Sequence, residues 1–245
     1  MLLQAKKTAL VTGANKGIGK EVVRQLAARG FQVFLGSRDE ARGQAAVDEL
    51  RAAGHNDVHL LVLDVTSDES VKAAAETLAK KVTALDVLVN NAGIVASGFK
   101  FGLQEPLAEI QETYSVNVFG VIRTILAFVE LVKKSKAGRI VNVTSGLGSI
   151  STASDKNAAS YAINTVGYGS SKSALNMITV AYAKALAEFN VKVNAVCPGH
   201  TATDLNNNTG PQTVEVGATS TITAATLPDD GPSGTYFNKD GPIPW

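Results

Sequence analysis

The sequence predicts an α/β fold in which a doubly wound parallel sheet of about seven strands carries helices on both faces. Three observations support this prediction. Short apolar runs of β type alternate with stretches of helical periodicity along the chain. The segments between consecutive runs are long enough for the right-handed crossovers that parallel strands require. Glycine-rich and polar motifs follow the ends of the runs, which is where ligands bind in open α/β sheets.

The expected strands are the short apolar runs, and the expected helices fill the longer stretches between them. Their composition places strands at residues 8–11, 32–36, 58–63, 87–90, 139–144 and 191–196, with a short last strand at 235–237. Helical spacing, such as that of Val22, Val23 and Leu26, places helices at residues 20–29, 39–53, 67–82, 105–134 and 168–189. No repeat or linker separates these elements, so residues 1–245 are expected to form a single domain.

The bulk composition is typical of a globular enzyme. With 45% hydrophobic residues, the 245-residue chain can bury a substantial core. Its net charge of +1, from 23 basic and 22 acidic residues, predicts no strong attraction to nucleic acid or to a membrane surface. The single cysteine, Cys197, excludes an intramolecular disulfide and fits a reducing compartment. Residues 1–7 are too few and too polar for a signal peptide, and no apolar run approaches a membrane span, so we expect the cytoplasm.

A glycine-rich turn at residues 12–19 follows the first expected strand and leads into the first expected helix. Gly13, Gly17 and Gly19 allow a sharp turn and a close approach of the backbone to a pyrophosphate, whose charge is favoured at a helix N-terminus. The spacing is Gly-x-x-x-Gly-x-Gly rather than the common Gly-x-Gly-x-x-Gly. A glycine turn without a ligand is the alternative, which the flanking strand and helix disfavour.

Tyr168 and Lys172 stand four residues apart in an expected helix, so their side chains share one face. A free tyrosine titrates near pH ~10, and a neighbouring cation favours the phenolate, so we expect Lys172 to lower the pKa of Tyr168. Such a phenol can give up and take back a proton more readily. The pattern by itself is common on helix surfaces, and Tyr161, with Thr165 four residues on, lacks the cation.

These motifs resemble those of the short-chain dehydrogenases/reductases, a family of Rossmann-type enzymes, and the resemblance runs along almost the whole chain. Within the family the chain is most similar to the carbonyl reductases, through residues 37–39 and 42–46 and the tail at 230–237. The matching segments are residues 12–19, Asp64 with Val65, residues 90–93, Asn117, Ser145, Tyr168 with Lys172, and residues 197–203.

The resemblance implies four catalytic residues and hydride transfer from a nicotinamide cofactor. Tyr168 would donate a proton to the substrate oxygen, and Ser145 would polarise the carbonyl by a hydrogen bond. Lys172 would bind the nicotinamide ribose, and Asn117 would hold a backbone and water relay to solvent. The expected substrates are aldehydes, ketones or quinones. No group of residues has the spacing of metal ligands, and this chemistry requires no metal.

The same motifs imply which residues bind the cofactor, and the charges near the second strand favour NADP over NAD. Arg38 and Lys16 are cations where an NADP enzyme binds the 2′-phosphate, so NADP(H) is expected; a solvated surface arginine is the alternative for Arg38. Asp39 is interpreted as an acid in the first turn of the next helix. Asp64 is expected to bind the adenine edge, or to cap the helix near residue 67, or both. The expected cofactor-binding residues are Gly13, Asn15, Lys16, Gly17, Ile18, Gly19, Arg38, Asp64, Val65, Asn91, Tyr168, Lys172, Thr201 and Thr203.

Two segments near the pocket are expected to be loops. Residues 146–167 form an insertion that is about ten residues longer than in tetrameric members of the family, so a loop or short helix beside the pocket, and a monomer rather than a homo-oligomer, are expected. Residues 200–212 are expected to form a mobile substrate loop, in which His200 lines the pocket without titrating. Two alternatives stay open: an NAD-dependent alcohol or sugar dehydrogenase, and a non-catalytic dinucleotide-binding sensor.

Overall fold

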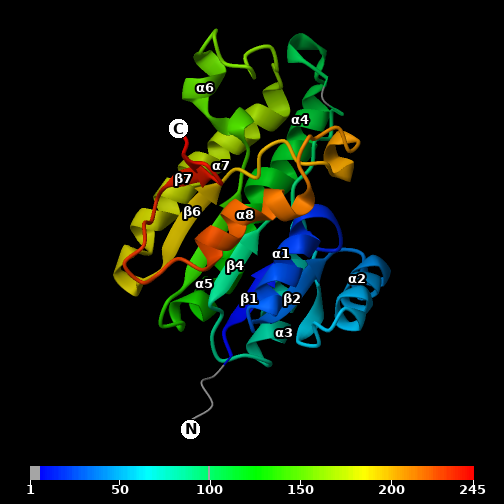
Figure 1. Ribbon diagram of the computed structural model, residues 1–245, viewed down its shortest axis with the longest axis vertical. Helices are drawn as coiled ribbons and strands as arrows, with labels where there is room; N and C mark the ends of the chain where they lie inside the picture. The colour runs from blue at the N-terminus through cyan, green and yellow to red at the C-terminus, as the bar shows by residue number, and fades with distance from the viewer. Residues whose placement is uncertain (1–5, 99) are drawn as a thin grey trace.

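An open sheet forms the centre of the molecule (Figure 1). The computed structural model describes residues 6–98 and 100–245, and within them eight strands form one sheet in the order β3-β2-β1-β4-β5-β6-β7-β8. The strands from β1 to β7 run parallel, and β8 pairs antiparallel with β7. The strands are β1 (Thr8–Val11), β2 (Gln32–Ser37), β3 (Val58–Val62), β4 (Val87–Asn90), β5 (Arg139–Val143), β6 (Lys192–Val196), β7 (Tyr236–Asn238) and β8 (Gly241–Pro242).

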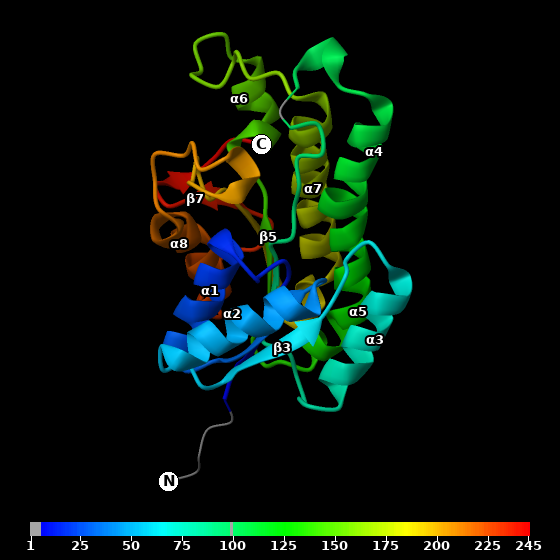
Figure 2. The same cartoon turned by 90° about the vertical axis from the view of Figure 1, so that its right-hand side faces the viewer.

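Helices cover both faces of this sheet, as Figure 2 shows. One layer contains α1 (Gly17–Ala28), α2 (Glu40–Ala52) and α8 (Val214–Ala225), and the other contains α3 (Asp68–Ala79), α5 (Val121–Lys133) and α7 (Val166–Ala185). Alternate residues of β1 serve the two cores, since Ala9 and Val11 pack in the first layer and Leu10 packs in the second. Strands buried on both faces are continuous apolar runs. The predicted doubly wound α/β fold is confirmed.

Two side-chain caps fix where the helices after β2 and β3 begin. Asp39 precedes α2 and accepts a hydrogen bond of 2.9 Å from the backbone N–H of Arg42. Ser67 precedes α3 and accepts one of 3.1 Å from the N–H of Ser70. The interpretation of Asp39 as an acid at the start of a helix therefore agrees with the structure. The alternative in which Asp64 caps α3 is wrong, because Ser67 occupies that position.

The helix predicted over residues 105–134 has an irregular centre. A π-helical turn, Ser115–Gly120, joins α4 (Leu107–Tyr114) to α5, and such turns often occur at functional sites. By length and composition, Leu107–Lys133 could cross a membrane, which corrects the expectation that no apolar run approaches that length. However, 56% of its most apolar window is buried inside the protein, as in the core helix of a sheet protein.

Several short elements differ from the expected pattern. The sequence did not predict β8, α8, η1 or η5, whereas a short helix within residues 146–167 was expected, and residues 1–5 of the N-terminal segment lie outside the described residues. Helix α8 buries Ser220 and Thr221 along with its apolar side chains, so its sequence lacks a clear apolar stripe. The short helices are η1 (Gly102–Gln104), η3 (Gly146–Gly148), α6 (Ile150–Ser154), η4 (Ala187–Phe189) and η5 (Asp204–Asn206).

Candidate active site

A cleft opens at the carboxyl ends of β1, β2, β3 and β4 and reaches α7. Its volume of about 380 Å³ lies within the range of ligand sites. Nearly all of the cofactor-binding residues expected from the sequence line it, although they come from six separate segments. The lining residues are Gly13, Asn15, Lys16, Gly17, Ile18, Gly19, Arg38, Leu63, Asp64, Val65, Thr66, Asn91, Ala92, Gly93, Ile94, Val116, Val143, Thr144, Tyr168, Lys172, Pro198, Thr203, Asp204 and Leu205.

The glycine turn at residues 12–19 packs tightly against the chain after β4. Gly13 has a φ of +60°, and a Cβ there would lie 2.8 Å from the Cα of Ala92. A Cβ on Gly19 would overlap the side chain of Asn91, whose Nδ2 donates to the carbonyls of Thr12 and Gly13 at 3.0 and 3.1 Å. Asn91 therefore holds the turn to the end of β4. The turn leads into α1 at Gly17, where the first backbone N–H groups suit a phosphate.

Two exposed cations stand at the mouth of the cleft. The Nζ of Lys16 lies 2.6 Å from Oδ2 of Asp204 in the substrate loop, and both side chains are more than half exposed. Arg38 follows β2 and lies close enough to Asp64 for its charge to act on that carboxyl. Lys16 and Arg38 together fit the 2′-phosphate of a dinucleotide. The ion pair of Lys16 with Asp204 was missed by the sequence reasoning, because 188 positions separate the two residues.

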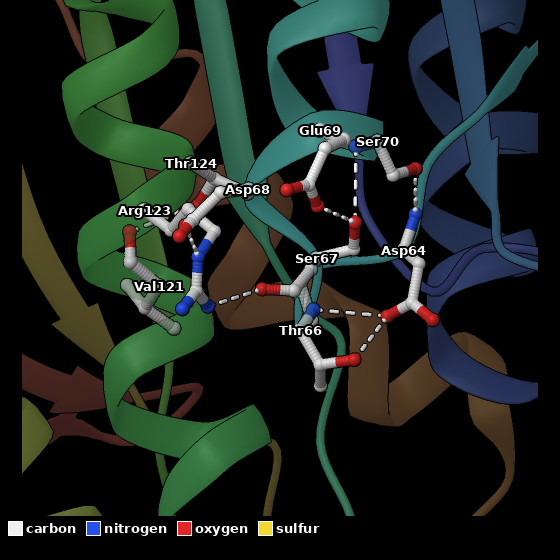
Figure 3. Close-up of polar contacts among 10 residues, drawn as sticks. Asp64, Thr66, Ser67, Asp68, Glu69, Ser70, Val121, Arg123 and Thr124 are labelled. Carbon is white, nitrogen blue, oxygen red and sulfur yellow. Dashed lines mark hydrogen bonds and ion pairs between the residues drawn. The ribbon is translucent and has the colours of Figure 1, made fainter.

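Asp64 lies at the turn between β3 and α3 and is held by Thr66 (Figure 3). Its Oδ1 accepts hydrogen bonds from the backbone N–H and the hydroxyl of Thr66, at 2.9 and 2.7 Å. Burial raises the pKa of Asp64, but these hydrogen bonds and the charges of Arg38 and Arg123 outweigh burial, so the net pKa is lowered. Asp64 is thus an ionised acceptor that faces the cleft, which fits a hydrogen bond to an adenine amino group.

Tyr168 and Lys172 lie on the first turns of α7 and are both buried. The Nζ of Lys172 lies 5.7 Å from the ring centroid of Tyr168 and donates a hydrogen bond of 2.9 Å to the carbonyl of Val143 at the end of β5. Ser145, two residues beyond β5, forms a side-chain hydrogen bond with Tyr168. The sequence-predicted serine, tyrosine and lysine are therefore brought together.

The pKa of Tyr168 is raised, whereas the sequence led us to expect that Lys172 would lower it. Burial raises it to about 12, while the hydrogen bond with Ser145 lowers it and the neighbouring Cys197 raises it. Burial also lowers the pKa of Lys172 to about 8. The expected lowering of the Tyr168 pKa by Lys172 is therefore wrong for the protein alone, because desolvation of the buried phenolate exceeds the lowering by the Ser145 hydrogen bond. Tyr168 is protonated at neutral pH and can donate its proton to an oxygen beside it.

Asn117 lies in the second layer behind the cleft, in the π-helical turn. Its Oδ1 accepts from the backbone N–H of Ile94 at 2.9 Å, and its Nδ2 donates to the carbonyl of Ile94 at 3.0 Å and to Ser171 Oγ at 3.1 Å. This side chain therefore ties the chain after β4 to α7, which fits the backbone part of the expected relay.

Other expected residues differ from the predicted arrangement. Within residues 6–98 and 100–245, the cleft lining leaves out Thr201, which is buried and donates its hydroxyl to the carbonyl of Pro198 at 3.1 Å. Binding of the cofactor by Thr201 therefore stays a prediction, while Thr203 does line the cleft. Tyr161 is 46% exposed, and His200 lies within 3.4 Å of Thr209 in the substrate loop.

In the same described ranges, no group of acidic, histidine or cysteine side chains could hold a metal ion.

The chain is similar to known proteins over its whole length. A sequence model of short chain dehydrogenases matches residues 7–213. The (+)-neomenthol dehydrogenase of Arabidopsis thaliana is 35% identical, with 98% of each protein covered. Carbonyl reductase (NADPH) 1 of Bos taurus is 32% identical, covering 97% of this chain and 98% of the relative. The solved structure of NADPH-bound carbonyl reductase from chicken fatty liver is 27% identical, with a TM-score of 0.84 over 99% of this chain and 100% of that one.

Proposed function

The chain belongs to the short-chain dehydrogenase family, and we propose that it is an NADP(H)-dependent oxidoreductase that reduces aldehydes or ketones to alcohols by hydride transfer. The observation that carries this proposal is the hydrogen bond between Ser145 and Tyr168 beside a cleft that also contains the glycine turn and Lys172. A protein that only binds a dinucleotide has no use for a buried phenol paired with a serine hydroxyl at that place.

Each catalytic side chain has one task in this proposal. Ser145 donates a hydrogen bond to the carbonyl oxygen of the substrate and thereby polarises it. Tyr168 gives its proton to the same oxygen, and its raised pKa keeps the phenol protonated until that transfer. When bound, the dinucleotide supplies the hydride from its nicotinamide ring. Lys172 binds the ribose next to that ring, and Asn117 holds the backbone through which Lys172 reaches solvent.

NADP(H) is the cofactor that the cleft fits. The backbone of the glycine turn would hold the pyrophosphate, and Lys16 and Arg38 would bind the 2′-phosphate. Asp64 and the backbone of Val65 would bind adenine. The relatives support this choice, since a carbonyl reductase of similar fold is an NADPH complex.

A panel of aldehydes, ketones and quinones tests the function, with oxidation of NADPH and of NADH followed side by side. We expect turnover with several carbonyl compounds that have an apolar body, and a preference for NADPH. The names neomenthol dehydrogenase and carbonyl reductase support such small substrates. If the protein bound NADPH but oxidised it with none of these compounds, the enzyme proposal would be abandoned in favour of a dinucleotide sensor.

Arg38 gives the sharpest test of cofactor choice. Arg38→Gln removes the guanidinium that would bind the 2′-phosphate, and a hydrogen bond to a charged group contributes about 1.5–3 kcal/mol. We therefore expect the ratio of kcat/KM for NADPH over NADH to fall by about 10- to 100-fold. Arg42→Gln is the matched control, because it removes an equally exposed positive charge one turn into α2, outside the cleft lining within the described residues. An equal change in both variants would mean that only overall charge matters.

A cytoplasmic location and a monomeric state remain proposals. The insertion expected at residues 146–167 contains η3, α6 and a series of turns beside the start of α7. We propose that this insertion and residues 200–212 border the substrate. Gel filtration tests the monomer, and a tetramer would contradict it.

A further inference from the structure

The last strands of the chain return to the loop that carries Ser145. In both views (Figures 1 and 2), the red C-terminal segment ends beside the loop that leads into α6. Tyr236, the first residue of β7, is 2% exposed, and its hydroxyl donates a hydrogen bond of 2.7 Å to the carbonyl oxygen of Ser145. The same oxygen accepts the N–H of Gly148 at 2.8 Å. Two donors therefore fix the peptide plane immediately after Ser145.

The position of Tyr236 is itself set by the sheet. β7 pairs parallel with β6, and Tyr236 is in register with Ala195. The Tyr236 ring packs on Ala195 and Cys197, and the ring of Trp245 stacks on it with centroids 5.4 Å apart and an interplanar angle of 27°. A tyrosine held on both sides in this way keeps its hydroxyl at one place, so it can serve as a fixed donor.

Further bonds connect the C-terminal segment to the same loop. Ser149 Oγ donates to the carbonyl of Pro244 at 2.7 Å, and the N–H of Ser151 donates to the carbonyl of Trp245 at 2.9 Å. On the β6 side of the loop, the N–H of Gly146 donates to the Sγ of Cys197 at 3.1 Å. The turn that follows Ser145 is thus held between the C-terminal segment on one side and Cys197, next after β6, on the other.

We propose that Tyr236 is a positioning residue for the reaction: its hydroxyl holds the Ser145 peptide so that Ser145 Oγ points at Tyr168 and at the substrate oxygen, with Trp245 holding the Tyr236 ring. This inference rests on the proposed function. Two hydrogen bonds to its oxygen restrain the rotation of the peptide after Ser145. Ser145 Oγ in turn accepts from the N–H of Leu147 at 3.2 Å, so the direction of the side chain depends on the turn that Tyr236 holds. Tyr236 touches neither substrate nor cofactor in this scheme and acts only through Ser145.

Tyr236→Phe tests the proposal, since it keeps the ring and removes one hydroxyl. We expect kcat to fall about five- to tenfold, the worth of about one hydrogen bond, while the KM for NADPH changes less than about twofold. Tyr114→Phe is the matched control, because its hydroxyl bonds Ser170 Oγ at 2.9 Å on the outer side of α7. An unchanged kcat in Tyr236→Phe, or an equal loss in Tyr114→Phe, would overturn the positioning role.

The pH profile of the reverse reaction separates positioning from a merely structural effect. Alcohol oxidation needs the Tyr168 phenolate, and the hydrogen bond with Ser145 lowers the pKa of Tyr168. Loosening Ser145 therefore raises that pKa and moves the acidic limb of the profile to higher pH. Lys172 on α7, Cys197 after β6 and Tyr236 on β7 also face this region; Lys172 and Cys197 stay in place in the variant, and the phenol of Tyr236 is the group removed. A lower rate with an unmoved acidic limb would overturn the proposal.

Hydrogen exchange gives a readout that does not depend on the proposed activity. In Tyr236→Phe, the amides of residues 145–151 should exchange faster, while those of β1 and α1 stay unchanged. Trp245→Leu, which keeps β7 intact, should speed the same amides if Tyr236→Phe fails to fold. If the wild-type protein reduces no carbonyl compound, the proposed function fails, but hydrogen exchange still tests whether Tyr236 holds the turn at residues 145–151. Unchanged exchange at these residues in the variants would overturn the positioning role of Tyr236.

Discussion

Replacing Tyr168 with phenylalanine is expected to reduce carbonyl reduction by about 10²- to 10⁴-fold, the usual contribution of a positioned proton donor. The variant keeps the buried ring and loses only the hydroxyl that bonds Ser145. NADPH binding should change little, since the glycine turn, Lys16 and Arg38, which are proposed to hold the dinucleotide, line the cleft and stay intact in the variant. The loss should therefore fall on kcat and kcat/KM alike, which marks an interaction made in the transition state.

Steady-state rates, with NADPH affinity measured by fluorescence titration, check this expectation. Tyr182→Phe is the matched control, because Tyr182 lies on the same helix, is partly buried and packs against the core of the second helix layer. Normal turnover in Tyr168→Phe would refute the proton-donor role. A loss of NADPH binding in step with turnover would instead assign Tyr168 to the cofactor.

Periodicity and composition predicted most of the fold because the residues that form it act locally. The runs at β1, β4 and β5 are buried on both faces, and their mostly apolar composition made them visible without any tertiary information. Helix α8 was invisible for the opposite reason. Its buried face includes Ser220 and Thr221, and Ser220 donates to the carbonyl of Cys197, so a tertiary contact replaces the apolar stripe.

In the candidate site, too, residues in local motifs were predicted from the sequence, and contacts between distant parts of the chain were not. The glycine turn, Asn91 and Asp64 were predicted because each lies in a short motif after a strand, and the Tyr168–Lys172 pair was predicted from its spacing on one helix. Contacts across the chain were not predictable, as with Lys16 to Asp204. The direction of the Tyr168 pKa was also missed. A spacing of four residues shows that a cation is near, but the cost of desolvation depends on the surrounding packing, which no local pattern reports.

We expect the buried ammonium of Lys172 to lower the stability of the folded protein, although the proposed reaction requires it. Its pKa falls from 10.5 to about 8 because burial penalises the ammonium, and a shift of that size corresponds to about 3 kcal/mol. Lys172→Met removes this cost, while the carbonyl of Val143 loses a donor at a cost of about 1 kcal/mol. We therefore expect the variant to be more stable by about 2 kcal/mol at pH 7, and its turnover to fall by about 10²-fold or more because the ribose contact is lost.

The pH dependence of that gain identifies its cause. A lysine whose folded pKa lies below its unfolded value destabilises the fold fully below about pH 8, and the penalty disappears as the pH rises toward 10.5. Chemical denaturation of both proteins should therefore give curves that differ most at pH 7 and converge above pH ~10. Lys184→Met, an exposed lysine of the same helix, is the control and should change neither stability nor rate appreciably. If the difference in unfolding free energy between the two proteins did not vary with pH, repacking around residue 172 would account for it. The buried ammonium of Lys172 would then contribute little to the stability of the fold.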